Sequence, residues 1–120
     1  MIINLTAHPI SIIDRNLVTF NKVTREYVSS NPVVIQEIPA SGTVARCIQI
    51  ETEQSTIEGI PTIKLEWGTV TGLPEPESGK YYVVSQIVKN ASPMRNDLLV
   101  PTHMVKDTTG RIVGCLAFAK

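Results

Sequence analysis

Apolar and polar residues alternate with a period of two along most of the chain, the pattern of half-buried β-strands. This pattern predicts short strands over residues 1–6 and 10–13. Pro9 separates them, because proline has no amide proton to donate to a ladder. Residues 21–32 mix polar and apolar groups and are expected to form a loop. The remaining predicted strands cover residues 17–20, 33–38, 43–52, 63–67, 81–84 and 98–100.

Two hairpin connections are also predicted. Residues 53–59 are polar and are expected to connect the long strand before them to the alternating strand after them. Residues 106–110 end in Gly110, which suits a tight turn between Met104-Val105 and a final strand over residues 111–119. That final strand is apolar on both faces, which favours an interior position in a sheet.

The period changes after Tyr82, where apolar residues follow helical spacing and Ser85 can cap a helix. The sequence therefore predicts one short α-helix near residues 85–91, ended by Ser92-Pro93, with a continued strand as the alternative. The expected fold is mainly β, a small barrel or sandwich with this one helix, in a single domain over residues 1–120. The helical stripe consists of Val83, Val84, Ile87, Val88 and Ala91.

Composition and charge exclude several classes of partner. Eleven basic residues balance eleven acidic ones without a basic stripe, so non-specific binding to DNA or RNA is not expected. No apolar run approaches the roughly 18 to 20 residues that span a bilayer, so no membrane partner is expected. Cys47 and Cys115 each lie in an apolar, strand-like run. We expect two buried, reduced thiols in a cytosolic protein.

Arg46 is the most informative candidate, because it falls on the apolar face of a predicted strand with Val44 and Ile48. A guanidinium there needs a partner. The partner is either a carboxylate at the rim of the core or an anionic ligand such as a phosphate.

Two further groups of polar residues are candidates. Arg95 and Asp97 lie in the loop after the helix, either as a structural clamp or as readers of a phosphate or base. Asn4, Thr6 and His8 are two residues apart and would share one face of an extended segment. That face is expected to belong to a solvated edge strand, or to hold a sugar or base.

Motifs for established catalysis or cofactor binding are missing from the chain. It has no glycine-rich phosphate loop and no closely spaced set of cysteine and histidine ligands. We therefore expect no cofactor and no metal. The acidic pairs Glu51/Glu53 and Glu75/Glu77 are expected to be solvated. Tyr81, Tyr82 and Trp67 are expected in the core, with stacking on a base as the alternative.

The chain resembles, nearly end to end, a family of short accessory proteins encoded by tailed phages and prophages. The resemblance implies an anti-defence role in the cytoplasm of the host bacterium, and it highlights Arg46, Ser85, Arg95 and Asp97 as residues suited to a ligand pocket. The matching segments are Asn4-Leu5-Thr6-x-His8-x-Ile10, Pro39-x-Ser41-Gly42-x-x-Ala45-Arg46, Gly68-x-Val70-x-Gly72-Leu73-Pro74, Tyr82-Val83-Val84-Ser85, Arg95-x-Asp97-Leu98-x-x-Pro101 and Asp107-x-x-Gly110-Arg111-Ile112-Val113-Gly114-Cys115.

The expected function is sequestration, without cleavage, of a small anionic nucleotide signal of cyclic-nucleotide or ADP-ribose type, in a homo-oligomer. Direct binding to a host defence protein is the alternative. A small hydrolase of such signals and a minor virion component rank lower. The candidate ligand-binding residues are Arg46, Arg95, Asp97, Ser85, His8, Asn4 and Tyr82.

Overall fold

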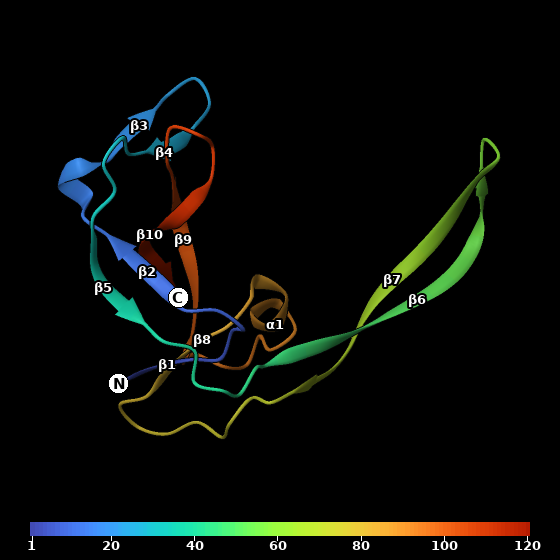
Figure 1. Ribbon diagram of the computed structural model, residues 1–120. Helices are drawn as coiled ribbons and strands as arrows, with labels where there is room; N and C mark the ends of the chain where they lie inside the picture. The colour runs from blue at the N-terminus through green and yellow to red at the C-terminus, as the bar shows by residue number, and fades with distance from the viewer.

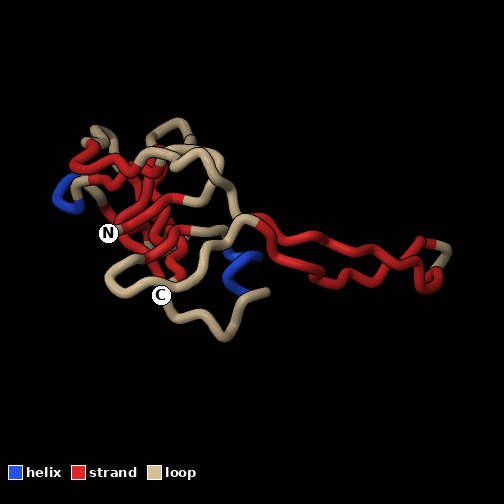
Figure 2. Tube along the Cα trace, turned by 90° about the horizontal axis from the view of Figure 1, so that it is seen from below, coloured by secondary structure: helices blue, strands red, loops and turns tan.

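A computed structural model describes residues 1–120 and has two parts, a body and an arm (Figure 1). The arm is the hairpin of β6 (Arg46–Ile57) and β7 (Ile60–Thr71), and the body is the rest of the chain. The Cα radius of gyration is 17.5 Å, whereas a compact chain of this length has about 14 Å. The difference arises because the arm projects away from the body, as Figure 2 shows from below.

The body is one curved, nearly closed, barrel-like sheet. Its strands lie in the order β1-β8-β9-β10-β2-β5, and β3 and β4 form a small hairpin that joins it through β9. The seam between the two end strands is bridged where Ala40, just after β5, pairs with Asn4. The strands are β1 (Ile2–Asn4), β2 (Ile10–Ile13), β3 (Thr19–Asn21), β4 (Glu26–Val28), β5 (Val34–Ile38), β8 (Tyr81–Val83), β9 (Leu98–Lys106) and β10 (Ile112–Ala119), with a 3-10 turn at Arg15–Leu17.

The predicted fold class is confirmed, and the single α-helix lies where the change of period placed it. The helix α1 covers Gln86–Asn90, and the Ser85 hydroxyl accepts a hydrogen bond from the Val88 amide as its N-cap. Val88 points into the core and is 1% exposed. The core beneath the helix is formed by Leu5, Ala45, Tyr82, Val84, Val88, Leu98 and Val100.

The terminal hairpin is also as predicted. β9 and β10 pair in antiparallel register, and the connection at Asp107 ends in Gly110. β10 is an interior strand between β9 and β2, and Cys115 on it is fully buried. β9 continues through Pro101, where the sequence predicted an end. Proline is tolerated because β9 pairs with β8 only up to Leu99 and with β4 only from Val105, so Pro101 lies in the open stretch between them.

Two other sequence predictions are corrected by the body. The segment 21–32 contains β4 in addition to loop, and β4 is held by pairing with both β3 and β9. Cys47 is a free thiol but only half-buried, because it lies at the root of the arm; Cys115 is free and buried, as expected. Burial raises the pKa of the Cys115 thiol. No helix of the structure is long and apolar enough to cross a membrane.

The arm differs most from the sequence prediction. Residues 53–57, expected in the connection, extend β6, and the turn itself is only Glu58-Gly59. Both turn residues have positive φ, 51° and 79°, as a two-residue type I′ turn requires. The alternation over Ile63–Trp67 predicted a half-buried strand, with Trp67 in the core; the strand forms, but Trp67 is 48% exposed. The apolar column of this strand faces solvent. The prediction failed because alternation identifies an apolar face without identifying what covers that face.

Candidate functional site

An open groove lies where the arm leaves the body, with a volume of about 340 Å³. Small-molecule sites have volumes of roughly 300 to 1,000 Å³. We call this the root groove. Its walls come from the turn after β1, the entry to β6 and the start of α1, and no acidic residue lines it. The lining residues are Leu5, Thr6, Ala7, Val44, Ala45, Arg46, Cys47, Ser85 and Ile87.

Backbone hydrogen bonds fix the walls of the root groove. The Ala45 amide donates to the Leu5 carbonyl oxygen at 2.9 Å, which joins the first wall to the second. Leu5 and Ala45 are both buried in the core cluster, so the floor of the groove is part of the folded body. Ser85 is fixed as the cap of α1. The core therefore fixes the floor of the groove, while Thr6, Ala7 and Val44 lie in the loops on either side of it.

Arg46 is the only charged residue of the root groove. It is exposed, and it makes neither a salt bridge nor a side-chain hydrogen bond; the four salt bridges of the protein involve other residues. The carboxylate partner at the core rim, one of the two interpretations of Arg46 from the sequence, is therefore wrong. An exposed, unpaired guanidinium beside hydroxyl and apolar groups can bind an anion that also has an apolar part.

Arg95 and Asp97 bind each other. Arg95 donates two hydrogen bonds to the Asp97 carboxylate, from Nε at 2.9 Å and from Nη2 at 2.8 Å. Both side chains are largely buried, 18% and 10% exposed. These hydrogen bonds hold the pKa of the Asp97 carboxyl below its ordinary value and raise the pKa of Arg95. Of the two interpretations from the sequence, the geometry favours a structural clamp over a phosphate contact. The Arg95 guanidinium is already paired with the Asp97 carboxylate.

The Arg95–Asp97 pair predicts a pH-dependent stability. Asp97 has a lowered pKa in the folded state, so its contribution is complete above the unfolded value of about 3.9 and is lost as the pH falls through the lower folded value. We expect Asp97→Asn to cost about 2 kcal/mol of unfolding free energy at pH 7 and to weaken the acid dependence. Urea unfolding at pH 7 and pH 3 measures both effects.

Glu37→Gln is the matched control for Asp97→Asn, because Glu37 is exposed and outside every salt bridge. Its acid dependence should match that of the parent protein. Equal acid dependence of the Asp97→Asn variant and the parent would contradict the assignment of the clamp.

Asn4, Thr6 and His8 do not form the solvated strand face that was expected. Asn4 is 1% exposed, and its Oδ1 accepts hydrogen bonds from the Thr6 amide and hydroxyl at 2.9 and 2.6 Å. Its Nδ2 donates to the carbonyl oxygens of His8 and Ile38. An asparagine side chain that binds the backbone two residues ahead bends the chain, so the segment turns after β1 and the shared face is lost. Asn4 is occupied by the fold, and only Thr6 reaches the root groove.

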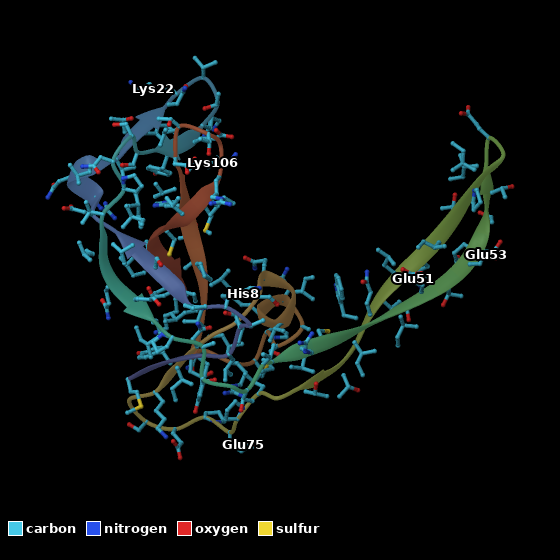
Figure 3. The ribbon with its side chains drawn as sticks, viewed as in Figure 1. His8, Lys22, Glu51, Glu53, Glu75 and Lys106 are labelled. Carbon is cyan, nitrogen blue, oxygen red and sulfur yellow. The ribbon has the colours of Figure 1, made fainter.

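The other predicted site residues lie elsewhere. Tyr82 is 2% exposed and lies beside a different hollow that Glu75 and Glu77 also line, a poor environment for an anion. His8, labelled in Figure 3, is exposed and follows the lining residue Ala7, but it does not itself line the groove. Of the seven candidates from the sequence, Arg46 and Ser85 line the root groove, and Arg95 and Asp97 form a separate ion pair.

Sequence reasoning missed the apolar wall of the groove and the exposed arm. Leu5 and Ile87 looked like ordinary core positions, and nothing in the sequence distinguishes a core residue from one at the floor of a groove. The sequence does contain a pattern that could have predicted the hairpin of the arm. Ile57 and Ile60 flank Glu58-Gly59, as expected for the strand ends at a two-residue turn.

Comparisons of the chain with protein-family models, with curated proteins and with solved structures find no match. The geometry of the root groove is therefore the structural starting point for assigning a function.

Proposed function

We propose that the protein is a phage accessory protein that binds and sequesters a small anionic nucleotide signal, of cyclic-nucleotide or ADP-ribose type, without cleaving it. The proposed setting is the cytoplasm of the infected bacterium, and the protein acts there as a homo-oligomer. The resemblance stated from the sequence motifs supports the setting and the anti-defence role, and the root groove supports the choice of site.

The observation that carries this proposal is the unpaired guanidinium of Arg46 in the root groove. No carboxylate lines that groove, so an incoming phosphate meets one positive charge and no negative one. A guanidinium matches phosphate geometry with two parallel hydrogen bonds.

The rest of the root groove suits the remainder of a nucleotide. The Ser85 hydroxyl lines the groove and can donate to a sugar or to a second phosphate oxygen. The Thr6 hydroxyl already donates its proton to Asn4 Oδ1, so its oxygen can accept from a sugar hydroxyl. The Ser85 oxygen already accepts from the Val88 amide, which leaves its proton free to donate. Apolar side chains such as Ile87 and Val44 offer a surface for the flat face of a base.

Depletion of ligand tests sequestration directly. Purified protein is incubated with a panel of cyclic oligonucleotides and ADP-ribose derivatives, the free ligand is measured, and the protein is then denatured. Depletion of one ligand and its intact recovery after denaturation are expected. Recovery of an altered product would replace the proposal with an enzyme, and a panel that is not depleted at all would overturn it.

Arg46→Ala is expected to weaken the binding of the depleted ligand by about ten- to a hundredfold. The melting temperature should stay within about 2 °C, because the side chain is exposed and unpaired. Titration calorimetry and thermal melting measure the two quantities. Arg15→Ala is the matched control, since Arg15 is an exposed arginine of the 3-10 turn outside the groove. Equal affinity of both variants would show that Arg46 does not hold the anion.

Direct inhibition of a host protein is the second candidate function, and the exposed arm favours it. In that case the ligand panel is not depleted, and the arm binds a protein other than a second copy of the chain.

A further inference from the structure

The arm presents an unusual amount of apolar surface to solvent. Seven large apolar side chains along it are each 47–65% exposed. The ladder of β6 and β7 pairs only with itself, and Figure 1 shows no element of the body lying along it. These side chains are Ile48, Ile50, Ile57, Ile60, Ile63, Leu65 and Trp67.

Each face of the arm combines one apolar and one polar column. Residues that pair directly across an antiparallel ladder share a face. Trp67, Leu65 and Ile63 therefore form a column beside their partners Gln49, Glu51 and Glu53. On the opposite face, Ile50 lies directly across from Glu66, Thr52 lies across from Lys64, and Ile48 is two residues before Ile50 on β6. Figure 3 shows Glu51 and Glu53 on the free part of the arm, far from the body.

A ribbon of this kind is not expected to stay ordered alone in water. An isolated two-stranded hairpin is marginally stable, and independent stability needs a third strand or a packed face. Contiguous apolar patches beyond roughly 300 to 600 Å² are rare on monomeric proteins. A surface that covers the apolar columns of the arm would therefore stabilise it.

We propose that a second copy of this chain covers the arm. The area fits: a ribbon of twelve residues per strand is about 40 Å long and about 10 Å wide, so its two faces offer about 800 Å². That is the area which one partner contributes to a standard protein interface, about 800 Å². Another copy of the chain is present wherever the protein is made. A second copy can therefore cover this apolar surface at all times.

Charge favours the same occupant. The arm, residues 46–71, has four acidic and two basic residues, while the whole chain has eleven of each. The body therefore has two more basic than acidic residues. By net charge, an arm of one copy is therefore attracted to the body of another.

Molar mass by light scattering tests the proposal, with the double variant Ile63→Lys/Leu65→Lys as the disruptive change. The pairs Glu53–Ile63 and Glu51–Leu65 lie directly across the ladder. Each lysine therefore faces a glutamate of its own arm, which favours the hairpin while it places charge in the interface. We expect the parent protein to have a multiple of the 13.2 kDa chain mass. The variant should have a dissociation constant at least about a hundredfold higher.

Trp67 reports the same event without a substitution, because it is the single tryptophan of the chain and is 48% exposed when the arm is uncovered. Dilution of the parent protein should shift its emission to the red and increase quenching by iodide.

Val23→Lys is the control for the mass measurement, since Val23 is 93% exposed on the body, and this variant should keep the parent mass. A parent protein that is monomeric at all accessible concentrations, with Trp67 open to iodide, would overturn the proposal and leave the arm to a different protein. Both results are independent of the ligand panel.

Discussion

Asn4→Ala is expected to lower the free energy of unfolding by about 3 kcal/mol or more, since each buried polar group that loses its partner costs about 1 to 3 kcal/mol. The side chain makes four hydrogen bonds, two as acceptor from Thr6 and two as donor to the carbonyl oxygens of His8 and Ile38. Alanine satisfies none of them, so the Ile38 carbonyl oxygen, which is buried, and the Thr6 amide, which is partly buried, both lose this partner.

Loss of the Asn4 side chain should also weaken the closure of the sheet, because of where Asn4 lies. Its backbone bridges Ala40 and accepts a hydrogen bond from the Ser41 amide at 3.0 Å, so the same residue closes the seam between β1 and β5. Thermal melting should show a midpoint lower by about 10 °C or more. Asn16→Ala is the control, because Asn16 is exposed and its side chain makes no hydrogen bond, and it should melt like the parent protein. An Asn4→Ala variant that melts like this control would contradict the assigned role of the residue.

Gly114→Ala is expected to cost about 3 kcal/mol, at the upper end of ordinary overpacking. A Cβ at this position would lie 2.5 Å from the Ser11 carbonyl oxygen and 2.7 Å from Cγ1 of Ile13. The first of these atoms is backbone and the second is in a side chain that is 1% exposed, so neither moves without separating β2 from β10. These two strands join the terminal hairpin to the N-terminal half of the sheet.

Urea unfolding measures the effect of Gly114→Ala, and Ala119→Ser on the exposed end of the same strand is the control. The control should unfold within about 0.5 kcal/mol of the parent protein. A Gly114→Ala variant with parental stability would show that β2 and β10 do not approach each other as closely as described.

Local signals explain the parts of the fold that the sequence predicted. The helix was found because its apolar spacing and its cap at Ser85 are both properties of neighbouring residues. The hairpin of β9 and β10 was found because a polar turn ending in Gly110 separates two apolar runs. In both cases the contacts that determine the element join residues close in sequence, so the local pattern of apolar and polar residues is enough to predict it.

The parts that were missed depend on what lies opposite a residue in space. Alternation at Ile63, Leu65 and Trp67 has the same form whether the body or another chain covers that face. The burial of Asn4 depends on Ile38, which is 34 residues away. Arg46 was identified as a candidate from its place on an apolar face, but its lack of a carboxylate partner is visible only in three dimensions. The site was therefore only partly predictable. The residue types pointed to Arg46 and Ser85, but the groove that both residues line could not be predicted from the sequence.

Hydrogen exchange at the backbone amides of the arm measures most directly whether a second copy covers it. In the parent protein, at a concentration where the oligomer forms, we expect the cross-strand amides of β6 and β7 to be protected nearly as well as those of β9 and β10. In the Ile63→Lys/Leu65→Lys variant, protection should fall in the arm and remain in β9 and β10. Arm amides that exchange freely in the parent protein while the body stays protected would contradict the account, as would a monomeric variant whose arm keeps full protection.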